Sequence, residues 1–292
     1  MPESKVKELV VISGKGGTGK TSLTASFAVL AGSPVLADCD VDAADLHLIL
    51  APSVRERNEF RCGNEAVIRS ADCTHCGKCL ELCRFGAIVR GGDGEHYAVD
   101  PVACEGCGVC VRFCPVQAID FPESLSGEWM VSETRCGPMV HARLGVAAEN
   151  SGKLVSTVRR EARRLAEENG SCLVIVDGPP GIGCPVIASM TGTSQALVVT
   201  EPTVSGEHDL ERVLKLARHF DIPAWVCVNK WDLNPAKAQQ IDALALRAGA
   251  KIAGRIRYDR GVTLAQMQEK AVVETDAPSA DDIRCVWESL GL

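Results

Sequence analysis

The sequence predicts an α/β fold with a mainly parallel, doubly wound sheet, into which a small α+β domain is inserted. Apolar, strand-length runs alternate with helical stretches in the first 50 residues and again after Glu128. Near-continuous apolar runs are typical of parallel strands that are buried on both faces. Between these regions, residues 61–122 contain closely spaced cysteines and many glycines. We therefore expect one split domain, residues 1–60 and 123–292, around an insert at residues 61–122.

The first elements are expected in the order strand, glycine-rich loop, helix, strand, which opens many α/β nucleotide-binding units. They lie at residues 7–13, 14–19, 20–31 and 33–42. Later strands are expected at 172–181, 196–202 and 224–232, and helices near 151–169, 185–193, 206–219 and 235–249. A last helix, at about 281–290, has apolar residues at helical spacing and an acidic polar face. That face favours packing on the core over binding to a membrane surface.

Composition and charge limit the function classes. The chain has 292 residues and a formal net charge of −7, and 4% of its residues are aromatic. Such a chain is a poor candidate for binding nucleic acid through phosphates or stacked bases. It lacks both an 18-residue apolar stretch and a signal-peptide pattern, so we expect a cytoplasmic protein without membrane contact. In that reducing compartment, the 15 cysteines favour metal or redox chemistry over disulfides.

Residues 14–21, GKGGTGKT, match the phosphate-binding pattern G-x-x-x-x-G-K-[ST] between a predicted strand and a predicted helix. Glycines let backbone N–H groups surround phosphate oxygens, and the helix directs its positive end at the anion. In such P-loops the lysine, here Lys20, reaches the β- and γ-phosphates, and the hydroxyl of Thr21 ligates Mg²⁺. The residues expected to bind the nucleotide here are Gly14, Lys15, Gly16, Gly17, Thr18, Gly19, Lys20 and Thr21.

The second lysine of the loop, Lys15, makes the motif similar to the deviant Walker A motif of the MinD/ParA class of ATPases, which includes the nitrogenase iron protein. The resemblance implies a nucleotide-sandwich dimer, of two copies or with a related ATPase, in which Lys15 touches the partner's nucleotide. It also implies that Asp40 orients the attacking water, with Asp38 and Asp42 as neighbours that could instead support Mg²⁺. Asp177, at the end of the apolar run LVIVD, resembles the Walker B aspartate that acts on Mg²⁺.

Two further segments extend this resemblance. Residues 177–181, DGPPG, are similar to the second switch of the class, in which Gly181 would sense the γ-phosphate. Residues 229–232, NKWD, are similar to a base-reading loop, which implies nucleotide contacts from Asn229 and Asp232. The pattern N-K-x-D is also the guanine-reading pattern of GTPases. ATP is preferred because the class usually reads adenine through the asparagine and the backbone; GTP, and a simple turn, are the alternatives.

Two runs of four cysteines have the spacing of bacterial ferredoxins, in which the fourth cysteine of each run ligates the other cluster. They predict two [4Fe–4S] clusters, cluster 1 on Cys73, Cys76, Cys79 and Cys114, and cluster 2 on Cys104, Cys107, Cys110 and Cys83. Zinc is the competing metal, but zinc sites pair two-cysteine knuckles rather than two runs of four. Arg84 departs from the pattern, because a proline usually follows the fourth cysteine.

A third, intersubunit cluster is a further hypothesis. Cys184 follows Asp177 at an offset where the nitrogenase iron protein has a cysteine that helps to hold a cluster shared between subunits. Cys136, just after the insert, is the candidate companion of Cys184. The alternative is that both are buried thiols.

The whole chain is thus identified as a member of the MinD superfamily of P-loop ATPases that carries an inserted ferredoxin domain. The preferred function is an ATPase whose nucleotide-switched dimer passes electrons through two clusters to a redox partner protein. The alternative is an iron–sulfur assembly carrier, although related carriers use a C-terminal C-x2-C pair and this chain has only Cys285 there. The third function is a positioning ATPase, which the acidic charge and the non-basic last helix disfavour.

Overall fold

The computed structural model describes residues 6–91, 96–145 and 150–292. The chain divides into two compact units. The large unit comprises Met1–Asn58, Glu128–Leu144 and Ser151–Leu292, and the small unit comprises Glu59–Gly127 and Gly145–Asn150. Strands β3 (Ser53–Asn64) and β8 (Glu123–Thr134) belong partly to each unit.

A nine-stranded sheet runs through the described residues of the large unit, in the order β13-β12-β11-β1-β10-β2-β9-β8-β3. All neighbours from β13 to β9 are parallel. Only two residues, Arg135 and Cys136, connect β8 to β9, a length that requires antiparallel strands. The sheet is therefore mixed but mainly parallel. The other strands are β1 (Lys7–Ser13), β2 (Val35–Asp38), β9 (Gly137–Leu144), β10 (Leu173–Pro180), β11 (Gln195–Thr200), β12 (Ala224–Asn229) and β13 (Lys251–Ile256).

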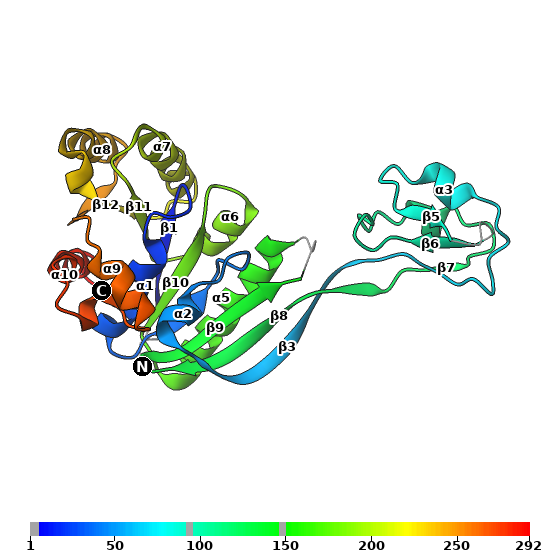
Figure 1. The fold of residues 1–292 in the computed structure, drawn as a ribbon, viewed down its shortest axis with the longest axis horizontal. Helices are drawn as coiled ribbons and strands as arrows, with labels where there is room; N and C mark the ends of the chain where they lie inside the picture. Colours follow the sequence, from blue (N-terminus) through cyan, green and yellow to red (C-terminus); the bar gives the residue numbers. More distant parts are fainter. Residues whose placement is uncertain (1–5, 92–95, 146–149) are drawn as a thin grey trace. The chain divides into compact units, whose positions relative to one another are not determined.

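Helices cover both faces of this sheet (Figure 1). On one face α1 contacts α2, α10 and the short helix η2, whereas on the other α5 packs against α6 and α7 against α8. This arrangement confirms the doubly wound fold that the alternation of strands and helices predicts. The helices are α1 (Lys20–Ala31), α2 (Leu46–Leu50), α5 (Ser151–Asn169), α6 (Cys184–Met190), α7 (Val204–His219), η1 (Trp231–Leu233), α8 (Pro235–Arg247), α9 (Gly261–Met267), η2 (Val272–Glu274) and α10 (Ser279–Ser289).

The core lies between the sheet and its helices. Residues 9–12 of β1 are fully buried, as expected for a central parallel strand. The last helix packs on this core, as its apolar spacing predicts: the ring centroids of Phe27 in α1 and Trp287 in α10 lie 5.0 Å apart, and Ile283 and Val286 are buried. None of the helices in the described ranges is both long and apolar enough to cross a membrane.

The small unit is built from two short strand pairs and two short helices within its described residues. Strand β4 (Val67–Ile68) pairs with β7 (Ile119–Asp120), and β5 (Ile88–Arg90) pairs with β6 (Tyr97–Val99), both antiparallel. Helix α3 (Lys78–Leu82) contacts α4 (Val109–Arg112). Each of these helices starts after a glycine in the left-handed conformation, Gly77 (φ 76°) or Gly108 (φ 71°). Each glycine directly follows the second cysteine of its run, so the two halves of the unit share one local design.

His141 is a buried histidine in β9, whose Nε2 lies 2.7 Å from the Ser132 hydroxyl in β8. Burial, then the positive field of His47 and Arg57, lowers the pKa of His141 to about 4. In the unfolded chain a histidine has a pKa near 6.5. The native state therefore binds fewer protons than the unfolded state between these two pH values, and its stability is lost as the pH falls through that window.

We expect this histidine alone to remove about 3 kcal/mol from the free energy of unfolding between pH 7 and pH 4. Urea denaturation of the protein and of His141→Gln, which retains a hydrogen-bonding group, measures this contribution. The wild type should lose more stability than the variant over that range. Parallel pH profiles for the two proteins would contradict the assignment.

Candidate nucleotide site and cysteine cavities

The phosphate loop connects β1 to α1 at the carboxyl end of the parallel strands. Gly17 and Gly19 have φ values of 77° and 86°, a region in which other residues are strained. A Cβ on Gly14 would lie 2.4 Å from Cβ of Asp209 in α7, and one on Gly19 would lie 2.4 Å from Nδ2 of Asn229. Backbone conformation and packing thus both require glycines in this loop.

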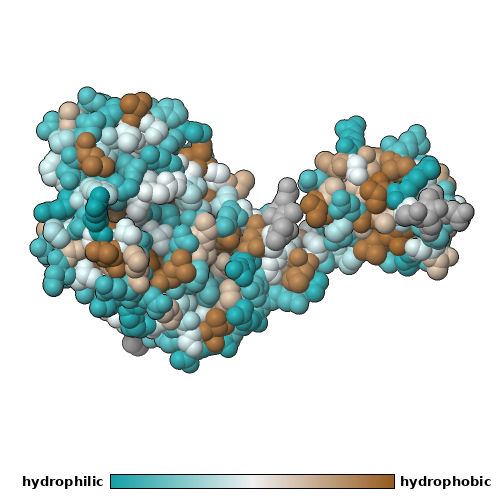
Figure 2. All heavy atoms as spheres, viewed as in Figure 1, coloured by the Kyte–Doolittle hydropathy of each residue, from teal (hydrophilic) through white to brown (hydrophobic). Residues whose placement is uncertain are grey.

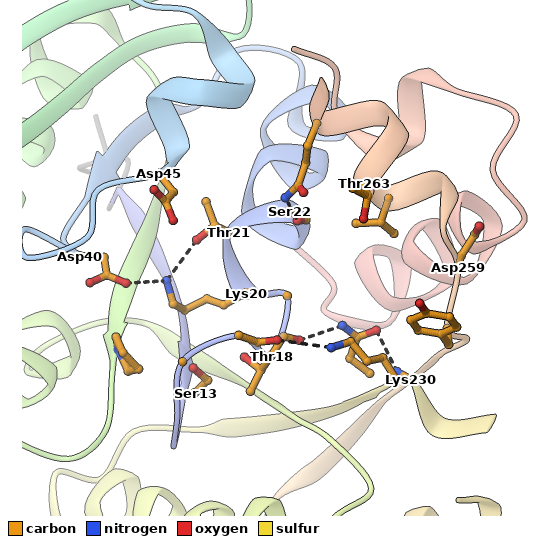
Figure 3. A pocket seen from close by; sticks show the side chains of 18 of the residues that line it. Ser13, Thr18, Lys20, Thr21, Ser22, Asp40, Asp45, Lys230, Asp259 and Thr263 are labelled. Carbon is orange, nitrogen blue, oxygen red and sulfur yellow. Dashed lines mark hydrogen bonds and ion pairs between the residues drawn. The ribbon is translucent and has the colours of Figure 1, made fainter. Parts of the chain in front are cut away.

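The loop opens into a cavity of about 480 Å³ in the large unit (Figure 3). At one end lie the loop residues and Asp40, and at the other the half-exposed ring of Tyr258 with Val262 and Gln266 of α9. A cavity of this size, polar at one end and partly apolar at the other, suits a nucleotide. The lining comprises Ser13, Gly16, Gly17, Thr18, Gly19, Lys20, Thr21, Ser22, Asp40, Ala43, Asp45, Pro180, Asn229, Lys230, Arg257, Tyr258, Asp259, Val262, Thr263 and Gln266.

Lys20 is buried at the polar end of the cavity, where its ammonium meets two carboxylates. Its Nζ lies 3.1 Å from Oδ1 of Asp177 and 3.4 Å from Oδ2 of Asp40, the latter contact drawn in Figure 3. Burial lowers the pKa of Lys20, but Asp177, Asp40 and Asp38 outweigh burial and raise the pKa above its usual value. Lys20 is therefore positively charged and is positioned to bind a phosphate group.

Asp177 and Thr21, the two residues expected to act on Mg²⁺, lie in direct contact. The Thr21 hydroxyl donates to Oδ2 of Asp177 at 2.8 Å, and Thr24 donates to Oδ1 at 3.0 Å. Asp38 stands opposite Asp177 in the sheet, and its Oδ2 is buried without a hydrogen-bond partner among the described residues. Burial, followed by the negative charge of Asp177, raises the pKa of Asp38 well above its usual value. These hard oxygen donors, one of them unpaired, fit a Mg²⁺ ion.

Asp40, the carboxylate expected to orient water, also lines the cavity. Burial raises its pKa, although the nearby charge of Lys20 opposes that shift. The structure thus brings Lys20, Thr21 and Asp40 to one end of one cavity, and Asp177 contacts Lys20 and Thr21 there without lining the cavity itself.

Several other predicted site residues do not line the described cavity. Lys15 points to Glu201, with Nζ 3.0 Å from Oε2. Gly181 has a φ of 97° and donates its N–H to the carbonyl of Ser13 at 2.8 Å. Neither residue is among the described residues that line the cavity, and the same is true of Gly14 and Asp177.

Asn229 and Asp232, the two residues of the predicted base-reading loop, have different positions and roles. Asn229 lines the cavity and donates to the carbonyl of Thr18 at 2.8 Å, so it fastens β12 to the phosphate loop. Asp232 lies outside the described lining, and its Oδ1 accepts the backbone N–H of Tyr258 at 2.7 Å. Asp232 therefore positions the segment after β13 that supplies Tyr258. The sequence analysis missed that segment because it did not predict β13, whose sequence KIAGRI is short and interrupted by charged residues and so gives only a weak strand signal.

The small unit brings the two cysteine sets together, each around its own cavity. One cavity is lined by Cys73, Cys76, Cys79 and Cys114, and the other by Cys83, Cys104, Cys107 and Cys110. Each set takes its fourth member from the other run, which is the exchange that the spacing predicts. Among the residues that the structure describes, no group of three or more His, Cys, Asp or Glu side chains is placed to hold a single metal ion.

Backbone N–H groups surround the crossing cysteines. Ala118 donates its N–H to Sγ of Cys114 at 3.3 Å. Burial raises the pKa of Cys83, but the backbone N–H groups of residues 85–88 outweigh burial and lower the pKa below its usual value. Such donors stabilise thiolate, the form of cysteine that binds iron.

The expectation that Cys136 accompanies Cys184 in a third cluster is wrong. Cys136 is buried in the turn between β8 and β9, before the start of a strand that runs parallel to β2. Cys184 is exposed at the start of α6, just after the carboxyl end of β10. Since β2, β9 and β10 run in one direction, the two thiols lie at opposite ends of the sheet.

Comparison with known proteins adds three findings. Residues 9–272 match the family model of the CobQ/CobB/MinD/ParA nucleotide binding domain. The chain is 34% identical over 234 residues to an uncharacterized protein of Methanocaldococcus jannaschii, which covers 78% of this chain and 80% of that protein. A 7Fe ferredoxin of Hydrogenibacillus schlegelii is 38% identical over 56 residues, which are 19% of this chain and 69% of that ferredoxin.

Among solved structures, the fold is similar to the septum site-determining protein MinD complexed with Mg-ADP from Pyrococcus horikoshii. The TM-score is 0.58 at 15% identity, and the match covers 98% of this chain and 96% of that one. This likeness concerns the fold. Because the family model spans most of the sequence and the phosphate loop opens into a nucleotide-sized cavity, the protein belongs to the CobQ/CobB/MinD/ParA family of P-loop nucleotide-binding proteins.

Proposed function

We propose that this protein is an ATPase that couples a nucleotide-switched dimer to electron transfer through two [4Fe–4S] clusters. The observation that carries the proposal is that one chain combines a P-loop cavity with two cavities that are each lined by four cysteines. The family generally consists of ATPases, which supports the first half. The similarity of a short segment to a ferredoxin supports the second half.

The chain's own residues account for the nucleotide chemistry. Lys20 would neutralise the β- and γ-phosphates, and Thr21 and Asp177 would hold Mg²⁺ against them. Asp40, beside Lys20, would orient the attacking water. ATP is preferred to GTP, because a guanine-reading carboxylate must reach the base and Asp232 is bonded to the backbone of Tyr258 instead.

The four thiols of each small-unit cavity would hold one cluster. All donors in these sets are soft thiolate ligands, which iron–sulfur clusters require. When bound, the clusters supply one-electron redox chemistry. The protein's part is to fix the thiolates, to donate backbone N–H groups to their sulfurs and to limit the access of water.

Exposed apolar side chains on the small unit support the proposal that a redox partner protein docks there. Phe85, Phe113, Val102 and Val116 are each more than two-fifths exposed, and Phe85 and Val116 also line the two cysteine cavities. Figure 2 shows apolar residues gathered on the visible face of this unit. Apolar side chains beside a redox centre provide a docking surface through which an electron travels a short distance.

A cluster carrier is the second candidate, because Cys76 and Cys107 are the exposed members of their sets. Exposed ligands favour release of a cluster to another protein. Transfer of iron and sulfide to an apo-ferredoxin, faster with ATP than without it, would favour this candidate over electron transfer.

The test is the oxidation of the reduced protein by a viologen dye under anaerobic conditions. The protein is reduced with dithionite, freed of reductant and mixed with oxidised dye, which takes one electron from each reduced centre. We expect MgATP to change the rate about tenfold relative to MgADP or no nucleotide, and Lys20→Ala to abolish this dependence. Equal rates in all three states for the iron-loaded protein would contradict the coupling.

A further inference from the structure

Glu201 is a carboxylate held between two lysines beside the phosphate loop. It follows β11 at the same edge of the sheet, and its side chain is 14% exposed. Its Oε2 lies 3.0 Å from Nζ of Lys15, and its Oε1 lies 2.5 Å from Nζ of Lys230. Lys230 also donates to the carbonyl of Gly17 at 3.4 Å. Glu201 thus connects the phosphate loop to the loop after β12.

The charges favour a stable ionic cluster. Burial raises the pKa of Glu201, but Lys230 and Lys15 outweigh burial and lower the pKa below its usual value. The carboxylate is therefore ionised at neutral pH. Each lysine side chain is about one-third exposed, so both ammonium groups also remain reachable from solvent.

The ammonium group of Lys15 cannot pair at the same time with Glu201 and with the phosphates of a nucleotide that another copy holds. While Lys15 is paired with Glu201 it points to its own subunit, and it does not line the described nucleotide cavity. Phosphate oxygens of a nucleotide held by another copy would have to compete with this carboxylate. Lys230 holds the carboxylate in place, so the pair breaks by movement of Lys15 rather than of Glu201.

We propose that Glu201 is a latch that retains Lys15 within its own subunit and thereby sets the ATP concentration at which the protein dimerises. This inference rests on the proposed function, in which Lys15 reaches the partner's nucleotide. Glu201 acts through Lys15 and is therefore a positioning residue. The latch opposes dimerisation until two bound nucleotides offer stronger anions than one carboxylate.

The test compares the protein with Glu201→Gln, which retains size and hydrogen bonding but removes the charge. Dimer formation is followed by analytical ultracentrifugation as a Mg²⁺-bound, non-hydrolysable ATP analogue is added. The half-maximal analogue concentration should fall about three- to tenfold in the variant. Affinity for fluorescent MgADP should stay within about twofold, because Lys15 lies outside the cavity and Lys230, which lines it, keeps its hydrogen bond to the carbonyl of Gly17. A general gain in positive charge would tighten ADP binding as well.

Two further variants keep the outcomes distinct. Glu207→Gln is the matched control, since Glu207 pairs with Lys237 of α8 and does not line the described cavity; it should dimerise like the wild type. Lys15→Ala should not dimerise. If Lys15→Ala fails to dimerise while Glu201→Gln behaves like wild type, the latch is wrong and the proposed dimer stands.

If Lys15→Ala dimerises normally, both the latch and the proposed role of Lys15 are wrong. If Glu201→Gln folds poorly, Glu201→Asp provides a second test, because it keeps the negative charge but has a shorter side chain that pairs less well with Lys15. It should also dimerise at a lower analogue concentration than the wild type, and a wild-type midpoint would overturn the latch.

Discussion

Replacing Lys20 by alanine is expected to lower the rate of ATP hydrolysis at least about 100-fold. Its ammonium lies between Asp177 and Asp40 at the phosphate end of the cavity, so no other described side chain supplies a buried positive charge there. Phosphate release in the presence of Mg²⁺ measures the effect. Lys215→Ala, an exposed lysine of α7 that is paired with Glu211, is the matched control and should hydrolyse ATP like the wild type.

The same substitution removes the cation that compensates two buried carboxylates, Asp38 and Asp177. Stability must therefore be measured alongside activity. Lys20→Gln, which fills more of the space, separates a folding defect from a catalytic one. Hydrolysis by a folded Lys20 variant within about threefold of the wild type would contradict the assignment of this cavity.

Removing one cysteine from either set is expected to halve the iron content of the anaerobically purified protein, from about eight to about four atoms per chain. The informative variants are those of the crossing cysteines. Cys114→Ala should remove the same cluster as Cys73→Ala, because both thiols line one cavity, although Cys114 belongs to the other run. Cys83→Ala should likewise match Cys104→Ala. Iron analysis and electron paramagnetic resonance of the remaining cluster measure both.

Cys184→Ala is the control for these variants, since Cys184 is exposed in the large unit and lies outside both cavities. It should retain about eight irons. If Cys114→Ala instead matched Cys104→Ala, the exchange of ligands between the runs would be wrong. If the wild type instead contained about ten irons and Cys184→Ala contained fewer, the hypothesis of an additional cluster that involves Cys184 would be supported.

The central part of the sheet was predictable because its signals are local. Strands such as β1 and β10 are apolar on both faces, and the glycine pattern marks where β1 ends and α1 begins. The bounds predicted for helices α1 and α5 agree with the structure. The pairing of the cysteine sets was also predictable, because the two runs match the bacterial ferredoxin pattern, in which the fourth cysteine of each run joins the other set.

The edge of the sheet was not predictable from the same signals. Strand β3 has the sequence SVRERNEFRCGN and is exposed along most of its length, so it shows neither an apolar run nor a buried face. Its pairing with β8, and that of β8 with β9, depends on contacts between segments on either side of residues 61–122. The expected boundary near residue 60 therefore falls within β3, which ends at Asn64.

Two further features were not predicted from the sequence. One is the side of the nucleotide cavity formed by α9, and the other is the ionic cluster around Glu201. Tyr258 and Gln266 reach the cavity from segments that follow β13, more than 230 residues after the phosphate loop. Glu201 follows a strand that was predicted, but nothing in its neighbourhood along the chain indicates that Lys15 and Lys230 lie beside it. Only the parallel order of the strands brings these three residues to one edge.

The central claim is that the nucleotide state and the redox centres of this chain affect each other. A potentiometric titration followed by electron paramagnetic resonance tests it most directly, with the iron-loaded protein bound to a non-hydrolysable ATP analogue, to MgADP, or to neither. The account predicts that the analogue shifts at least one midpoint potential by about 60 mV, a tenfold change in electron affinity, and that Lys20→Ala removes the shift. Superimposable titrations in all three states would contradict it.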